Sequence, residues 1–301
     1  MNERKPDRVG QVFAALGKSV CYVALFLGMQ VAVMLPLIVS IISEAITGES
    51  VVDEDAILAL LSVDTMTLSL ISGLLTLTIV LAFYLIRRKK FSEALWLRPV
   101  LAPTLLTGAA LAPGLYLVVV AALAMLPEAW LDSYSEASAG IGGGTLIGVI
   151  AVAVVAPIVE EIIFRGLILN RLARVMPGWL AVVLSAAVFG VCHGHPVWFA
   201  YAFVLGVVFG FIDLRANSIL PSILGHVVFN AIGQIFSVIP ETEEGTEALV
   251  AMGVLLLVAI VAPLINRKGI AALLRKTSAG PVPVPEQIKE PKNYDYDPWD
   301  E

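Results

Sequence analysis

Residues 145–172 read TLIGVIAVAVVAPIVEEIIFRGLILNRL, and this stretch decides how the rest of the chain is interpreted. It is long enough to cross the hydrocarbon core of a bilayer, which needs about 20 apolar residues of helix. Two acids and a guanidinium, Glu160, Glu161 and Arg165, interrupt it. Ionisable groups at membrane depth cost ~2.5–3.5 kcal/mol each even on insertion scales, so they mark candidate functional sites. The stretch predicts a transmembrane helix that carries a polar reaction centre.

The composition of the whole chain indicates a membrane protein. Of 301 residues, 58% are hydrophobic and 15% are charged, and the mean hydropathy is +0.90. A soluble domain typically carries about 25% charged residues. We therefore expect an all-α, polytopic transmembrane bundle of about eight spans in the cell membrane. The predicted spans are roughly 20–42, 66–86, 101–126, 145–172, 179–193, 197–212, 218–239 and 249–265. The fifth and sixth are short, and a re-entrant hairpin is the alternative for that pair.

Lysine and arginine predict the orientation of the chain. All 19 fall on one side of the membrane if there are eight spans, whereas the loops of the other side carry only acids. Because basic residues accumulate on the cytoplasmic side, we expect both termini to be cytoplasmic. Acidic external loops disfavour nucleic acid as a ligand. The expected partners are membrane lipid and a peptide or protein substrate, which could itself be membrane-associated.

Four parts of the chain can be distinguished. Residues 1–143 hold three predicted spans and are interpreted as scaffold, whereas residues 144–240 form a four-helix core with the polar intramembrane residues. Residues 241–280 hold the eighth helix and a basic amphipathic segment, which we expect at the inner membrane surface. Residues 281–301 are rich in proline and charge and are expected to be a disordered cytoplasmic tail.

The acids of the fourth span are predicted to have different surroundings. Glu161 and Arg165 are i,i+4 neighbours on one helix face, so Arg165 can neutralise and orient Glu161. Glu160 is rotated by about 100° and is free to face a cavity as a proton acceptor. Pro157, just before the acids, is expected to kink the helix and help to open a polar recess.

Two histidines are predicted to lie at the same depth as Glu160. The turn at Met176-Pro177 lies 16 residues from both Glu160 and His193, so antiparallel helices place these two side chains at one level. His226 lies nine residues past Asn217, a similar rise from the cytoplasmic boundary. Asn230 follows His226 at i+4 on the same face.

The remaining polar and small residues receive other interpretations. His195, in Gly-His-Pro, cannot share the helix face of His193 and is expected to be a turn or cap residue. Gly206 and Gly210 form a small-x-x-x-small pattern that indicates helix packing. The two cysteines are far apart in sequence and offer no metal-ligand spacing, so a disulfide is not expected.

A carboxylate, an imidazole and a second imidazole–amide pair suit hydrolysis of an amide. Glu160, helped by His193, would deprotonate a water, and His226 and Asn230 would donate hydrogen bonds to the developing oxyanion. The same atoms also permit a zinc site with Glu160, His193 and His226 as ligands and water in the fourth position. The residues alone leave both schemes open.

Three motifs carry a resemblance to a known family: Glu-Glu-x-x-x-Arg (160–165), Phe-x-x-x-His (189–193) and His-x-x-x-Asn (226–230). In this order on predicted spans they resemble the motifs of the CPBP family, which includes type II CAAX prenyl endopeptidases and bacteriocin-processing or self-immunity proteins. The resemblance covers about residues 145–240. It implies an intramembrane endopeptidase, metallo- or glutamate-dependent, in which Glu160 and His193 activate water, His226 and Asn230 form the oxyanion site, and Glu161, Arg165 and Phe189 are supports.

Two other functions stay open from the sequence. One is a non-catalytic scaffold or bacteriocin-immunity protein that keeps the fold and works by binding. The other is a proton-coupled transporter that uses the acids and imidazoles as a relay, although no internal repeat suggests a transporter's two halves.

Overall fold

The computed structural model describes residues 8–47, 65–88, 95–138, 146–237 and 246–275, and within these ranges the regular structure is helical. The N-terminal helices are α1 (Arg8–Thr47), α3 (Thr65–Ile86), α5 (Ala102–Leu123) and α6 (Glu128–Ser138). The central helices are α7 (Leu146–Ile150), η1 (Ala151–Val155), α8 (Ala156–Glu161), η2 (Ile162–Leu169), α9 (Asn170–Val175) and α10 (Gly178–Val191). The last are α11 (Pro196–Ala216), α12 (Leu220–Ser237), α13 (Thr246–Ile265) and α14 (Arg267–Arg275).

The described helices are those of a multi-pass membrane protein. Among the described residues, six helices are long and apolar enough to cross a membrane, and two shorter apolar helices, Leu70–Ile86 and Gly178–Val191, match the predicted second and fifth spans. The predicted total of eight spans depends on these two. Lipid favours such a bundle, because each helix satisfies its own backbone hydrogen bonds.

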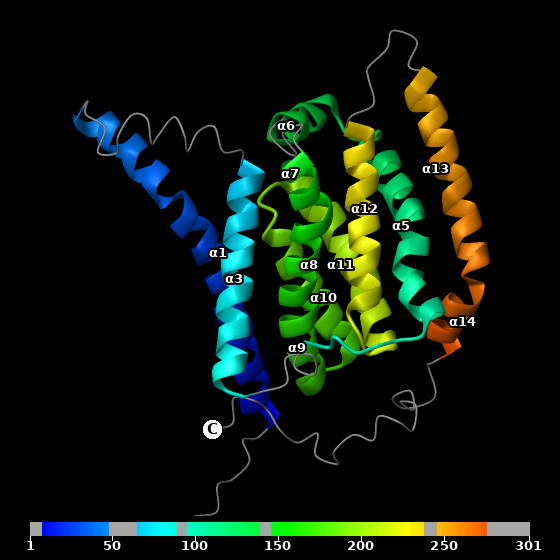
Figure 1. The fold of residues 1–301 in the computed structure, drawn as a ribbon, viewed down its shortest axis with the longest axis horizontal. Coiled ribbons are helices and arrows are strands. Elements are labelled where there is room, and N and C mark those ends of the chain that lie inside the picture. The colour runs from blue at the N-terminus through cyan, green and yellow to red at the C-terminus, as the bar shows by residue number, and fades with distance from the viewer. Residues whose placement is uncertain (1–7, 48–64, 89–94, 139–145, 238–245, 276–301) are drawn as a thin grey trace, which may run out of the picture.

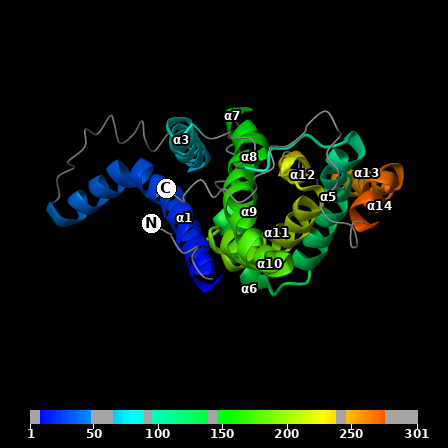
Figure 2. The ribbon, with the colours of Figure 1, turned by 90° about the horizontal axis from the view of Figure 1, so that it is seen from below.

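The bundle is arranged around the rod formed by α7 to α9. In Figure 1 the pair α1 and α3 lies on one side of this rod, and α12, α5 and α13 follow on the other. Seen from below in Figure 2, α10 and α11 lie between the rod and α5, with α12 nearby. The rod contacts α10, α11 and α12, and α11 contacts both α10 and α12, so these helices pack together.

The rod is not a uniform α-helix. Two π-helical stretches, η1 and η2, flank the short α8 that carries Glu160 and Glu161. The first ends directly before Pro157, where the Ala156 N–H bonds to the Ala151 carbonyl, five residues back. π-helical turns are rare and are frequent at functional sites. The stretch that was predicted to be kinked by Pro157 thus contains a change of hydrogen-bond register.

Three element boundaries differ from the sequence-based expectation. Helix α1 begins at Arg8 rather than near residue 20, because its polar first turns need no apolar run to be helical and no proline interrupts them. Helix α11 continues to Ala216 rather than ending near residue 212, and stops where Asn217 takes the left-handed conformation (φ 55°), a common helix terminus. Residues 128–138, expected to be an acidic loop, form helix α6.

Glycines allow two close helix contacts that fix the core. A Cβ on Gly206 would meet the Cβ of Ala186 at 2.8 Å, and a Cβ on Gly210 would meet Val182. The small-x-x-x-small pattern therefore packs α11 against α10, as predicted. A Cβ on Gly108 of α5 would collide with the main chain of Pro221 on α12. This second contact holds α12 against α5.

Several predictions fall outside the described residues. The boundaries after residues 143 and 240 and the whole tail at 281–301 lie in ranges that the structure does not describe. The basic segment after α13 is described as α14, which buries Gly269 and Leu273. Its position on a membrane surface stays a prediction.

Candidate active site

The two acids of α8 have different surroundings, although they are neighbours in sequence. Glu161 is fully buried, whereas the Glu160 side chain keeps 21% of its surface exposed. Arg165, only 1% exposed, places Nη1 3.2 Å from Glu161 Oε1 and lays its guanidinium 4.3 Å from the centre of the Phe189 ring. A buried ion pair of this kind needs both partners, because either charge alone would be strongly destabilising.

His226 connects the two acids. Its Nδ1 lies 2.8 Å from Glu161 Oε1, within hydrogen-bond distance, and its Nε2 lies 3.7 Å from Glu160 Oε2. Because a carboxylate only accepts, Nδ1 carries the proton and donates it to Glu161. In neutral His226, Nε2 is therefore the acceptor and faces Glu160. The site contains an acid–imidazole–acid chain that runs from buried Glu161 to partly exposed Glu160.

His193 lies at the end of α10, beside Phe189. The helix ends at Val191, so its last carbonyls lack main-chain partners of their own helix. The His193 Nδ1 lies 2.8 Å from the Phe189 carbonyl and donates to it, which leaves Nε2 with a free lone pair. The Phe189 ring contacts both imidazoles, with centroids 4.7 Å from His193 and 5.9 Å from His226. Phe189 thus joins the two histidines.

Asn230 is held against the rod by an orphaned carbonyl. Its Nδ2 donates to the Val152 carbonyl at 2.9 Å. In the π register of η1, this carbonyl would pair with the residue five positions on, which is Pro157 and has no N–H. Asn230 supplies the missing donor, and its second N–H stays available for a ligand. Pro157 therefore helps to place Asn230, a link that the sequence alone did not reveal.

The predicted residues form one connected group rather than pointing at separate surfaces. Glu160 faces His226, Asn230 is bonded to the helix that leads into Glu160, and Phe189 contacts both histidines. His195 lies apart from them: its Nδ1 accepts from Val197 N–H at the start of α11, and its Nε2 is 3.1 Å from Ser133 Oγ on α6. It is a cap residue, as expected.

Two residues of this region were missed in the sequence. Asp213 and Ser222 are both fully buried, and both act electrostatically on Glu161 or Arg165. Asp213 lies one position beyond the predicted end of the sixth span, near residue 212. The available signal was helix length. The acid stands between apolar residues and three positions before Ala216, so a sixth span of ordinary length for a membrane helix would have included it.

The zinc scheme has candidate ligand atoms but no complete ligand group. In the part of the chain that the structure describes, no three His, Cys, Asp or Glu side chains are grouped so that they could hold a metal ion. Nδ1 of His226 is bonded to Glu161 and Nδ1 of His193 to a carbonyl, which leaves Nε2 of each imidazole as the atom that could bind a metal. The zinc scheme stays a prediction.

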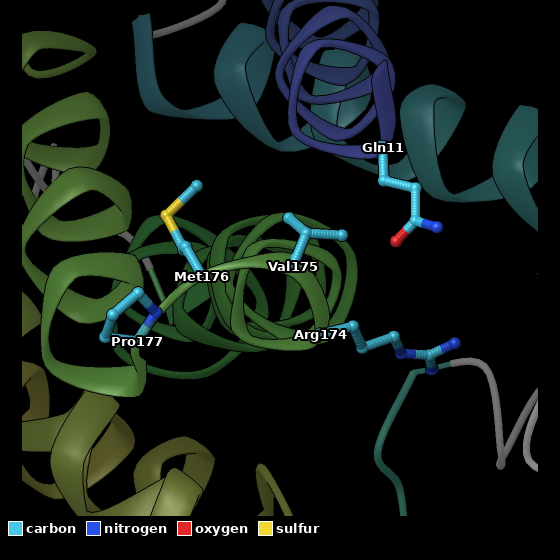
Figure 3. A pocket seen from close by; sticks show the side chains of 5 residues that line it. All are labelled: Gln11, Arg174, Val175, Met176 and Pro177. Carbon is cyan, nitrogen blue, oxygen red and sulfur yellow. The ribbon is translucent and has the colours of Figure 1, made fainter. Parts of the chain in front are cut away.

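Two hollows of the surface lie elsewhere. One of about 560 Å³ is lined by Gln11 of α1 and residues 174–177, and Figure 3 shows Gln11 pointing from α1 toward Val175 and Arg174. Another of about 460 Å³ lies on α14. Arg174 lies on the same rod as Glu160, but in α9, at the end of the rod. Neither hollow includes a residue of the acid–imidazole group, so contacts and not cavity size identify the site.

Comparison with known proteins agrees with this location. Residues 142–232 match the family described as "Type II CAAX prenyl endopeptidase Rce1-like". The chain is 29% identical over 92 residues to a Bacillus subtilis (strain 168) protein named "Putative membrane peptidase YdiL", which covers 31% of this chain. The matched part spans 38% of that relative's length. No solved structure matches this chain. The matched segment holds all three motifs and every residue of the site.

Proposed function

We propose that this multi-pass membrane protein, which through residues 142–232 belongs with the Rce1-like type II CAAX prenyl endopeptidases, is an intramembrane endopeptidase. It hydrolyses a peptide bond with a water activated by Glu160 and His193. The observation that carries the proposal is the contact chain from Glu161 through His226 to Glu160, with Phe189 joining His193 to it. Structural ion pairs of a membrane bundle would not need two imidazoles and a partly exposed acid together.

Water activation falls to the two groups with free basic atoms. Glu160 is the exposed acid of the pair, and His193 Nε2 has a lone pair because its Nδ1–H is bonded to the Phe189 carbonyl. A water held between a carboxylate and a neutral imidazole can lose its proton as it attacks a carbonyl carbon, a contribution of typically 10²–10⁴-fold. The proton of the water passes to this pair as the carbonyl is attacked.

The oxyanion is stabilised by His226 and Asn230. Asn230 offers its second Nδ2–H, and its first fixes it to Val152. His226 offers an Nε2–H only as the imidazolium, because its Nδ1–H is bound to Glu161. Glu161 favours this cation as it forms. His226 therefore takes up a proton from Glu160 and donates it toward the developing charge or the leaving amine. One such donor is worth about 2.7–4 kcal/mol in a dry site.

The expected substrate is a peptide or protein that reaches the site from the membrane. The bundle presents an apolar outer surface to lipid, as the exposed aliphatic side chains of α3, α5 and α13 show. A prenylated C-terminus, as in the family's name, is one substrate of this kind, and a membrane-associated peptide without a lipid is another.

The decisive test is turnover by purified protein in detergent with a fluorogenic peptide library. Glu160→Ala and His193→Ala are expected to lose cleavage by at least about 10²-fold, because each removes a proton-transfer group. His195→Ala is the matched control, since this imidazole caps α11 and is bonded to Ser133, and it should cleave like the wild type. Full turnover by both alanine variants would contradict the proposal, because cleavage would then not depend on these groups, whereas no cleavage by the wild type would favour the scaffold, immunity or transporter functions.

The dependence on metal is tested separately. The same assay is run with and without a chelator, together with elemental analysis of the protein. If Glu160 and His193 activate the water without a metal, cleavage persists in the chelator. Loss of cleavage that zinc restores would instead support the metal-dependent scheme.

A further inference from the structure

Helix α14 (Arg267–Arg275) is fixed to the bundle by one of its faces. A Cβ on Gly269 would collide with the Pro103 carbonyl of α5, and Leu273 packs into the apolar cluster that α5, α11 and α12 form. Arg215 of α11 donates from Nη1 to the Leu273 carbonyl at 3.2 Å, which gives a partner to one of the last carbonyls of the helix. The exposed side of α14 is therefore held in a set position on the bundle.

Three cations line a hollow on this exposed side. The hollow, of about 460 Å³, is bounded by Arg267, Lys268, Ala271, Ala272 and Arg275. The last four of these stand at i, i+3, i+4 and i+7, so they form one stripe along the helix surface. The two alanines keep the floor of the stripe low, and Lys268 and Arg275 stand about 10 Å apart along the axis at ~1.5 Å per residue. The stripe is a recess with a positive charge at each end.

The described chain does not neutralise the positive charge of this hollow. No ion pair among the described residues involves a cation that lines it. The sequence has no acid between Glu247 and Arg275. Asp213, near the end of the neighbouring α11, is 0% exposed and does not face the hollow. The cations are therefore available to an anion from outside the described chain.

The apolar helix that leads into α14 indicates what carries this anion. In Figure 1, α14 lies at the lower end of α13. Helix α13 is long and apolar enough to cross a membrane, and its last turns expose Val261, Leu264 and Ile265. A phospholipid can place its acyl chains along this surface while its phosphate meets the cations of α14. A free phosphate would use the charge alone and leave the apolar surface uncovered.

We propose that the hollow on α14 binds the headgroup of an anionic phospholipid whose acyl chains lie along α13. The phosphate oxygens accept charge-assisted hydrogen bonds from the lysine and arginine side chains. Because the hollow exists only while α14 is packed on α5 and α11, the bound lipid stabilises this packing. The inference goes beyond the proposed peptidase and does not depend on it.

The test measures lipid binding by the full chain in a neutral detergent. Native mass spectrometry gives the Kd of the first bound lipid, for dioleoylphosphatidylglycerol and for zwitterionic dioleoylphosphatidylcholine. The wild type should bind phosphatidylglycerol more tightly. Lys268→Gln combined with Arg275→Gln should weaken phosphatidylglycerol binding roughly 30-fold, at about fivefold for each cation near a membrane surface. Its binding of phosphatidylcholine should not change.

The matched control removes the same charge elsewhere at the same end of the bundle. Arg87→Gln combined with Arg88→Gln changes two exposed cations directly after α3, and should bind phosphatidylglycerol like the wild type. An equal loss in the two double variants overturns the proposal, because it would show a general attraction of anions to this end of the bundle. Equal affinity of the wild type for the two lipids overturns it as well.

Inorganic phosphate, added at the concentration of the lipid, separates a lipid site from a phosphate site. It should leave phosphatidylglycerol bound, because it cannot replace the contacts of the acyl chains. Displacement of the lipid by phosphate overturns the assignment of the hollow to a phospholipid.

The unfolding temperature gives a second readout. Phosphatidylglycerol should raise it for the wild type and for the control, since a ligand that binds only the folded state stabilises that state. It should not do so for the Lys268 and Arg275 double variant, although all three proteins should unfold at the same temperature without lipid. A rise of equal size in all three overturns the proposal. Neither readout uses peptide cleavage, so a wild type that cleaves nothing counts against the proposed function alone.

Discussion

At the scale of single residues, the pair Glu161–Arg165 is held together by the cost of burying either charge alone. Both side chains have at most 1% of their surface exposed. Arg165→Met leaves the Glu161 carboxylate without its guanidinium, and breaking a buried pair in this way costs about 3–5 kcal/mol. We expect this variant to unfold at a markedly lower temperature than the wild type in detergent.

The matched control removes both charges. Glu161→Gln combined with Arg165→Met leaves no orphan charge in the pair, so it should recover part of the lost stability while peptidase activity stays abolished. A double variant that unfolds as early as Arg165→Met, or earlier, would show that the side chains are needed for packing rather than for mutual neutralisation.

The residues of the site could be predicted largely because ionisable groups are conspicuous in apolar helices. The i,i+4 spacing placed Arg165 on Glu161, and equal rise from the helix ends placed His193 and His226 near the level of Glu160. Spacing could not show which nitrogen of each histidine is occupied, because that depends on partners from other helices. Asp213 was missed in the sequence for a related reason, since only its buried surroundings in the structure distinguish it.

At the scale of elements, the π-helical stretch before Pro157 yields a second prediction. Pro157→Ala would restore the N–H that the π register offers to the Val152 carbonyl. Asn230 would then lose its partner, and its amide would no longer be fixed toward the site. We expect kcat to fall about tenfold or more, less than the 10²–10³ found when an oxyanion donor is deleted.

The stability of Pro157→Ala should not fall with its activity. A proline inside a helix costs a backbone hydrogen bond, so Pro157→Ala should not lower the unfolding temperature. Pro263→Ala in α13 makes the same change in a helix outside the site and should leave kcat unchanged. Equal activity of Pro157→Ala and wild type would show that the π register does not position Asn230 for catalysis.

Hydropathy predicted the existence of the elements better than their ends or their internal register. Each of the eight apolar segments corresponds to a described helix. Helix α6 was missed because its surface position needs no apolar run, and none of its residues is buried. The π-helical register depends on hydrogen bonds rather than on side-chain polarity, so no pattern of apolar residues predicts it.

At the scale of the whole molecule, the order of the helices makes the orientation testable. Helices α3, α9, α11 and α13 end, and α5 and α12 begin, at the lower end of Figure 1, whereas α6 lies at the upper end. Basic residues lie in the last turns of α9 and α11 (Arg174 and Arg215) and directly after α3 and α13 (Arg87 and Arg267), and α6 carries acids. The positive-inside rule places the lower end in the cytoplasm.

Two exposed positions report the two ends in a background without native thiols, made by Cys21→Ser and Cys192→Ala. Ser135→Cys on α6 should react with a membrane-impermeant maleimide in intact cells. Ala272→Cys on α14 should react only after the cells are permeabilised. The reverse pattern would show that the molecule has the opposite orientation in the membrane. Peptides would then have to approach Glu160 from the opposite side of the bilayer. Since α6 contacts the α10–α11 turn through Ser133 and His195, the labelling result also decides whether that contact lies outside the cell or in the cytoplasm.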